Sequence, residues 1–161
     1  MLLHYGGGSV KRNGLLDKVI NSLNAAGLPF VELGGVEPNP KLSLIRKGIS
    51  LCKSEEVNFL LAVGGGSVID SAKAIGVGLA NNCDPWDFIE TKTAPDKCMP
   101  VGVVLTLSAA GSEMSNSDVI TNDETHLKRG ITSEAVRPAV AFLNPENTFT
   151  VSKFQTGCGI V

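Results

Sequence analysis

Two nearly identical glycine stretches stand directly after apolar runs and limit the folds open to this chain. The first is HYGGGSVK at positions 4–11, and the second is VGGGSVID at positions 63–70. Each follows a run typical of a buried strand and precedes an apolar pattern with helical spacing. Glycine lets a backbone turn sharply and approach a bound group without a Cβ in the way. The repeated order of strand, glycine loop and helix predicts an α/β protein.

Apolar spacing along the rest of the chain predicts strands that alternate with helices. Apolar runs indicate strands at residues 2–5, 30–33, 59–63, 101–105, 119–121 and 139–143. Helical spacing indicates helices at residues 14–26, 41–53 and 68–80. The other long stretches are expected to be a loop with about one helical turn at 83–99, a polar turn at 122–130 and the start of a helix in the last ten residues. This alternation favours βαβ units and a mostly parallel sheet with flanking helices.

Composition excludes several classes of function. The chain has 161 residues, a net charge of −2 and 43% hydrophobic residues, which suits one domain with a core. It has no basic block and few aromatic residues, so we expect no nucleic-acid partner. No apolar segment reaches the roughly 18 residues of a membrane helix, and the first residues do not form a signal peptide. The cysteines match no zinc spacing and are expected to be reduced thiols, so we expect a cytoplasmic protein without a membrane partner.

The glycine loops have the chemistry of an anion site. In parallel sheets, ligands bind beyond the carboxyl ends of the strands, where both loops are expected to lie. A glycine loop that leads into a helix offers free N–H groups and a partial positive charge, which suit a pyrophosphate. The classical G-x-G-x-x-G fingerprint is not met, because Ile69 occupies the third glycine position, and no P-loop is present. A third Gly/Ser loop at 107–117 lies after another predicted strand.

Five motifs in register carry a resemblance to a known family. They are YGGGSVKRNG, GGVEPNP, LLAVGGGSVIDSAKAI, DPWDF and LTLSAAGSEMS. Over essentially the whole chain, the sequence resembles the iron-containing alcohol dehydrogenases, in particular the butanol dehydrogenase and aldehyde reductase branch. The resemblance implies a Rossmann-like cofactor domain of the dehydroquinate synthase-like type at residues 1–150. Residues 151–161 would then begin a truncated helical metal-binding domain.

The resemblance also implies which residues contact the cofactor. The implied set is Gly7, Gly8, Ser9, Asn39, Gly65, Gly66, Ser67, Asp70, Thr106, Ser108, Gly111, Ser112, Val119, Lys128 and Leu143. Within it, the second glycine loop would hold the pyrophosphate. NAD-preferring relatives carry an aspartate soon after the first strand, where this chain has glycine, and Lys11 and Arg12 bring positive charge nearby. The expected cofactor is therefore NADP(H), with NAD(H) as the alternative. Ser108 departs from the proline common in the family.

The implied activity is hydride transfer between NAD(P)H and an alcohol/aldehyde pair, as in the NAD(P)-dependent alcohol dehydrogenases of class EC 1.1.1. The metal, Fe(II) or Zn(II), is expected only in the missing C-terminal domain, and neither His4 nor His126 fits a ligand role. We therefore expect no catalytic residue in this fragment and no turnover by it alone. The expected partners are a small alcohol or aldehyde and a second copy of the chain in a homodimer.

Other readings of the same residues stay open. Asp70 has an alternative role as a first-turn helix carboxylate that favours the helix dipole. By residue type alone, Lys73 and Lys128 are expected to be solvated. The whole chain could also be a stand-alone nucleotide- or phosphate-binding domain without catalysis, or resemble the glycerol dehydrogenase or dehydroquinate synthase type. The residues that follow Val161 in the parent gene would separate the enzyme from the binding module.

Overall fold

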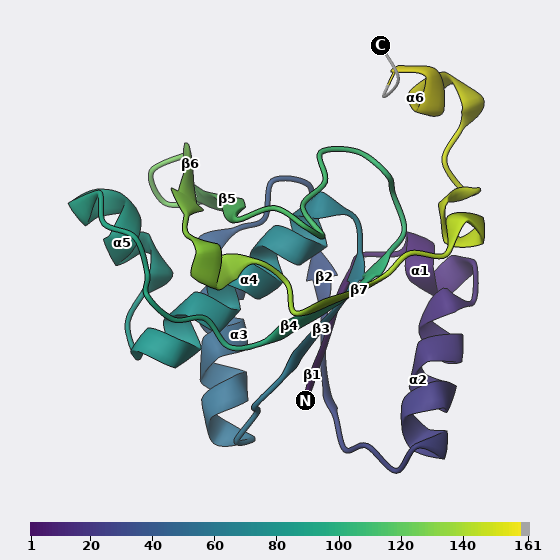
Figure 1. Cartoon of the computed structure of the whole chain (residues 1–161), viewed down its shortest axis with the longest axis horizontal. Coiled ribbons are helices and arrows are strands. Elements are labelled where there is room, and N and C mark those ends of the chain that lie inside the picture. The colour runs from purple at the N-terminus through teal and green to yellow at the C-terminus, as the bar shows by residue number, and fades with distance from the viewer. Residues whose placement is uncertain (159–161) are drawn as a thin grey trace.

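The computed structural model describes residues 1–158 and contains a five-stranded parallel sheet at its centre (Figure 1). The strand order is β2-β1-β3-β4-β7. Their bounds are β1 Leu2–Gly6, β2 Val31–Val36, β3 Leu60–Gly64, β4 Val101–Leu105 and β7 Val140–Phe142. The predicted Rossmann-like α/β fold with a mostly parallel sheet is confirmed.

Helices cover both faces of this sheet, with α3 and α4 on one side and α1 and α2 on the other (Figure 1). Their bounds are α1 Ser9–Arg12, α2 Leu15–Ala25, α3 Leu42–Ser54, α4 Gly66–Asn81, α5 Pro85–Thr91 and α6 Lys153–Cys158, with short 3₁₀ helices η1 Glu134–Val136 and η2 Pro145–Thr148. Helix α6 lies away from the body of the molecule (Figure 1).

Alternate residues of the strands pack into two hydrophobic cores. In β1, Leu2 packs with the α3 and α4 side, whereas Leu3 and Tyr5 pack with α2. Every residue of β3 is buried, which is typical of a central parallel strand. The uninterrupted apolar runs predicted as strands therefore lie at the centre of the sheet.

An antiparallel hairpin, β5 Ser117–Asn122 and β6 Leu127–Thr132, stands apart from the main sheet (Figure 1). The sequence prediction of a polar turn across 122–130 was wrong over β6. In this strand only Ile131 is buried, so no apolar alternation marked it. The hairpin contacts α4 and α3, and the amide of Thr121 donates to Pro40 O at 2.8 Å.

Three helices differ from the sequence prediction. Helix α4 begins at Gly66, two residues before the predicted start, because the glycine loop itself forms its first turn. Helix α1 was not predicted, since it has only four residues. Helix α5 is longer than the expected single turn, and Asp84 caps it by accepting a bond from the Trp86 amide. Within the described residues, no helix is both long and apolar enough to span a membrane.

Candidate functional site

Each strand of the parallel sheet is followed at its carboxyl end by a residue that the sequence predicts to bind a cofactor. In sheet order these residues are Asn39 after β2, Gly7 after β1, Gly65 after β3, Ser108 after β4 and Leu143 after β7. Ligands of open α/β sheets bind at this edge. The structure therefore gathers residues that are far apart in the sequence along one edge of the molecule.

Loop 2, residues 64–67, ends at the uncapped N-terminus of α4. Gly65 is the N-cap, and within residues 1–158 no side-chain hydrogen bond caps this end of the helix. The Gly65 carbonyl accepts bonds from the amides of Val68 and Ile69, at 3.0 and 3.2 Å. The first N–H groups of a helix have no partner within the helix, and the dipole gives this end a partial positive charge. The amides of Gly66 and Ser67 are therefore placed to bind an anion.

The glycines of loop 2 have distinct steric roles. A Cβ on Gly64 would lie 2.5 Å from Val68 Cγ2, so only glycine permits this tight turn from β3 into α4. A Cβ on Gly65 would lie 3.3 Å from Leu107 Cβ. At Gly66 the nearest such atom is the Ser112 Cβ, 3.9 Å away, so Gly66 borders open space. This small, uncapped helix end fits a phosphate or pyrophosphate group.

Loop 1, residues 6–9, lies beside loop 2 on the neighbouring strand. A Cβ on Gly6 would lie 3.7 Å from Val68 Cγ2, whereas one on Gly7 would have no neighbour within 4 Å. The Arg12 side chain folds back, so that its Nη1 lies 2.5 Å from the Cβ position of Gly8. The Lys11 ammonium lies 5.1 Å from the centre of the Tyr5 ring. Loop 1 is thus an open, exposed turn with cationic side chains next to it.

Asp70 joins α4 to the segments that precede and form β5. Its Oδ1 accepts a bond from Ser112 Oγ at 2.5 Å, and its Oδ2 accepts one from the Val119 amide at 3.1 Å. Burial raises the pKa of Asp70, whereas these two bonds and the nearby Lys73 oppose the rise. The alternative reading as a first-turn carboxylate was wrong, because α4 begins at Gly66 and Asp70 lies beyond its first turn.

The two lysines expected to be solvated have opposite environments. Lys73 is completely buried, so the expectation was wrong for this residue. Its ammonium donates to Ser117 O at 2.8 Å and Ser115 O at 3.0 Å. Lys128 is exposed, and its ammonium donates to Asn39 Oδ1 at 2.7 Å, which joins the hairpin to the turn after β2.

The third predicted loop leaves β4 next to loop 2 and then reaches a separate hollow. The Thr106 amide donates to Gly64 O at 3.1 Å, and Gly111 has a left-handed φ of 74° just before Ser112. Ser108 and Leu143 line a cavity of about 280 Å³ together with Leu105, Glu113, Asn144, Pro145 and Thr148. The predicted site residues therefore lie in loop 1, around loop 2 and α4, in the Asn39–Lys128 pair, and in the hollow beyond β4 and β7.

Two buried titratable residues near the site were missed by sequence reasoning. His4 bonds through Nδ1 to Leu33 O and through Nε2 to Ser71 Oγ, and burial lowers its pKa to about 4. Asp118 accepts a bond from the Ile131 amide at 3.2 Å, and burial raises its pKa to about 7. Among residues 1–158, no partner is present for Asp118 Oδ2. The buried face of β5 is formed by Asp118, Ile120 and Asn122, two of which are polar, so no apolar pattern in the sequence marked Asp118 as buried.

Metal-ligating side chains are scattered in this part of the molecule. Across residues 1–158, no group of three or more His, Cys, Asp or Glu side chains lies in an arrangement that could hold a metal ion. The thiol of Cys52 lies in the core, and burial raises its pKa to about 11.

Comparison with known families agrees with the motif resemblance. Residues 1–145 match the family described as iron-containing alcohol dehydrogenase. The chain is 53% identical over 161 residues to the probable NADH-dependent butanol dehydrogenase 1 of Bacillus subtilis, and it covers 42% of that protein. It is 41% identical over 164 aligned residues to the NADPH-dependent aldehyde reductase YqhD of Escherichia coli, again covering 42% of the relative. The chain thus spans about two fifths of these relatives.

The fold is also that of a solved relative. The crystal structure of the NADH-dependent butanol dehydrogenase A of Thermotoga maritima superposes with a TM-score of 0.93 at 45% identity. The match covers 98% of this chain and 40% of that one. The predicted dehydroquinate synthase-like character of the domain is confirmed by this likeness.

Proposed function

Because the chain belongs to the iron-containing alcohol dehydrogenase family, we propose that it is the NAD(P)(H)-binding domain of a metal-dependent oxidoreductase. The reaction we assign to the whole protein is hydride transfer between NAD(P)H and an alcohol/aldehyde pair. The chain spans 42% of its Bacillus subtilis relative, so this activity is a proposal for the parent protein. We propose that the chain alone binds the dinucleotide without turnover.

One observation carries the proposal: the uncapped N-terminus of α4 at loop 2. Gly66 and Ser67 form the first turn of α4 at the carboxyl end of a central parallel strand, and a Cβ on Gly66 would have no neighbour closer than 3.9 Å. A pyrophosphate there would interact with the positive end of a 16-residue helix. Asp70 would act by fixing Ser112 and Val119 beside this helix end.

We propose further that the domain prefers NADP(H) to NAD(H). Loop 1 has no carboxylate to repel a 2′-phosphate, and Ser9 and Arg12 are placed to donate charge-assisted bonds to it. The relatives differ in this respect: the Bacillus subtilis protein is named NADH-dependent, whereas the Escherichia coli reductase is named NADPH-dependent. The names of the relatives therefore do not decide between the two cofactors, and the proposed preference for NADP(H) rests on the residues of loop 1.

A bound NAD(P)H supplies the hydride that reduces a carbonyl carbon. The residues of this chain would bind and orient that cofactor: loop 2 through backbone amides, loop 1 through its cationic neighbours, and the turn after β2 through Asn39. We assign no catalytic residue to this chain. The Fe(II) or Zn(II) ligands and most of the substrate pocket would belong to the rest of the parent protein.

Fluorescence titration of the 161-residue chain with NADPH and with NADH tests both proposals. We expect saturable binding of both, with NADPH bound about tenfold more tightly, because a charge-assisted phosphate contact contributes about 1.5 kcal/mol. Equal affinities, or tighter NADH, would overturn the NADP(H) preference and leave the binding role intact. No binding of either dinucleotide would overturn the proposed function.

A further inference from the structure

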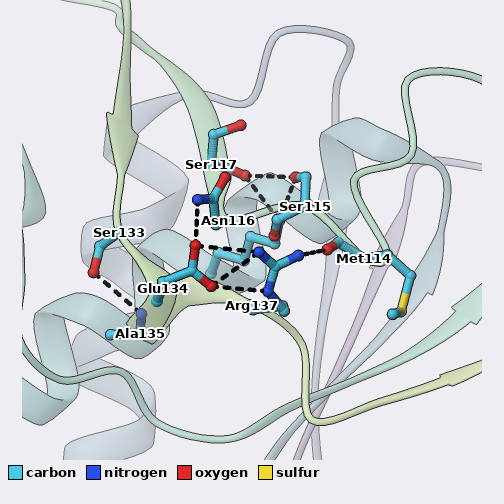
Figure 2. A network of polar contacts seen from close by, with 9 residues as sticks. Met114, Ser115, Asn116, Ser117, Ser133, Glu134, Ala135 and Arg137 are labelled. Atoms are coloured by element: carbon cyan, nitrogen blue, oxygen red, sulfur yellow. Dashed lines mark hydrogen bonds and ion pairs between the residues drawn. The ribbon is translucent and has the colours of Figure 1, made fainter.

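The segment 114–117 is held from the outside by a charged cluster (Figure 2). The Arg137 guanidinium donates to Met114 O and forms an ion pair with Glu134, at 2.9 Å between Nη2 and Oε2. Glu134 Oε1 in turn accepts a bond from Asn116 Nδ2 at 2.6 Å. Arg137 and Glu134 are partly exposed, with 42% and 73% of their side chains accessible. Exposed pairs of this kind contribute little to folding stability.

The same segment is held from the inside by Lys73 on α4. The Lys73 ammonium has no exposed surface and lies within bonding distance of four oxygens. These are Ser117 O at 2.8 Å, Ser115 O at 3.0 Å, Ser115 Oγ at 3.1 Å and Ser112 Oγ at 3.4 Å. Burial lowers the pKa of Lys73, and the charges of Asp70 and Asp118 oppose this. A buried ammonium is costly unless it is well bonded, and here backbone carbonyls satisfy it.

Lys73 stands one helical turn after Asp70, and the two residues hold the same stretch of chain. Asp70 bonds its two ends, at Ser112 Oγ and at the Val119 amide, while Lys73 bonds its middle. Ser112 is also the residue whose Cβ lies nearest the Cβ position of Gly66, at 3.9 Å. The stretch 112–119 is thus tied to α4 through Asp70 and Lys73, and its first residue, Ser112, borders the N-terminal turn of α4.

We propose that Lys73 is a positioning residue for the dinucleotide site. It holds the stretch 112–119 against the N-terminal end of α4, and being fully buried it does not touch the ligand. This inference rests on the proposed function. A lysine that only stabilised the core would affect the whole fold evenly, whereas a positioning lysine acts on the stretch that borders the N-terminal turn of α4.

The test compares Lys73→Met with Lys47→Met in the 161-residue chain. Lys47 makes a matched control because it lies exposed on the adjacent helix α3. Amide hydrogen exchange without nucleotide measures how firmly residues 112–119 are held, and NADPH titration measures the affinity of the dinucleotide site. For Lys73→Met we expect about tenfold faster exchange confined to that segment and about tenfold weaker NADPH binding. Lys47→Met should match the original chain in both measurements.

Two outcomes for a folded Lys73→Met chain overturn the inference. NADPH affinity within twofold of the original chain would do so, and so would exchange that rises evenly over the whole chain. If the original chain binds no dinucleotide, the proposed function fails and the inference falls with it. If Lys73→Met does not fold, Arg137→Met takes its place, because this exposed residue holds the same segment from outside. About threefold weaker NADPH binding in Arg137→Met would then support the inference that this segment must be held in place for binding. Unchanged binding would overturn the inference.

Discussion

Loops 1 and 2 share the sequence GGGSV but lead into very different helices. After loop 2, α4 runs for 16 residues, and from Val68 to Gly78 every residue except Asp70 is buried. After loop 1, α1 has four residues, of which only Val10 is buried, and Gly14 then adopts a left-handed φ of 75°. The same glycine loop therefore precedes a core helix in one place and an exposed turn in the other.

The residues that follow each loop account for this difference. Loop 2 continues into IDSAKAIGVG, whose small and apolar side chains let α4 pack closely on the sheet. Loop 1 continues into KRNG, where charged residues favour solvent and Asn-Gly favours a turn. A long helix presents a full dipole at its N-terminus, whereas a single turn contributes little. We infer that loop 2 binds phosphate through its backbone and that loop 1 does so through charged side chains.

The largest expected effect comes from a carboxylate placed in loop 2. In Gly66→Asp the new Cβ has room, and an acidic residue at this helix end favours the dipole, so the fold should be at least as stable. The carboxylate would occupy the proposed pyrophosphate position and repel it. We expect NADPH and NADH to bind at least about 100-fold more weakly, or about 2.8 kcal/mol.

The neutral variant Gly66→Asn separates charge from volume and should lose less affinity than Gly66→Asp. Thermal unfolding of both variants, recorded beside the titrations, checks that the fold is retained. A Gly66→Asp chain that is stable and binds both dinucleotides as before would show that loop 2 does not bind the pyrophosphate.

The next effect concerns two buried titratable groups, a histidine in the strand before loop 1 and an aspartate in β5. His4, in the strand before loop 1, has its pKa lowered to about 4, so the folded state binds fewer protons than the unfolded state between pH 4 and 6.5. This makes stability rise with pH over that range. Asp118, beside α4, has its pKa raised to about 7, so the folded state binds more protons and stability falls with pH. The two contributions oppose each other between pH 4.5 and 6.5.

Asp118→Asn removes the contribution of Asp118 to the pH dependence of stability and leaves that of His4. Between pH 4.5 and 6.5, the free energy of unfolding of Asp118→Asn should change by about 2 kcal/mol in the stabilising direction relative to the change in the original chain. Urea unfolding at pH 4.5, 5.5 and 6.5 measures this difference in slope. Asp17→Asn, an exposed carboxylate on α2, is the control and should follow the original chain. Equal slopes for Asp118→Asn and the control would contradict the burial argument.

A carboxylate in loop 1 should act on one cofactor only. Gly7 is exposed, and its new Cβ would meet no atom within 4 Å, so Gly7→Asp should fold normally. The carboxylate would repel a 2′-phosphate and accept bonds from ribose hydroxyls. We expect NADPH to bind about tenfold more weakly, or about 1.4 kcal/mol, with NADH unchanged or tighter. Gly7→Asn is the neutral control. If Gly7→Asp weakened the binding of NADPH and NADH equally, the inference that loop 1 contacts only the 2′-phosphate would be wrong.

Elements whose own residues carry a clear pattern could be predicted from the sequence. Strands such as β3 and β4 were predictable because a central parallel strand is apolar throughout. The glycine loops were predictable as turns between such strands and the helices. By contrast, β6 was missed because its exposed residues carry no apolar alternation. Its formation depends on pairing with β5, which is a tertiary interaction.

Within the candidate site, the sequence located the backbone donors but missed the buried charges. Gly65, Gly66 and Ser67 lie at the helix end that their motif predicts. Lys73 was expected in solvent because lysine is rarely buried alone. Its burial depends on carbonyls more than 40 residues along the chain, at Ser115 and Ser117, and no local pattern records that contact.

The smallest expected effects separate the two cations of loop 1. The Arg12 guanidinium lies over Gly8, within the loop, whereas the Lys11 ammonium lies over the Tyr5 ring, 5.1 Å from its centre. Arg12 is therefore better placed to meet a 2′-phosphate, and its planar donors suit phosphate geometry. We expect Arg12→Met to weaken NADPH binding about fivefold, or about 1 kcal/mol, and Lys11→Met by less than about twofold. NADH binding should be unchanged in both, and the two variants serve as each other's control. A larger loss of NADPH affinity in Lys11→Met than in Arg12→Met would mean that Lys11 leaves the ring to bind the phosphate, and the assignment within loop 1 would be reversed.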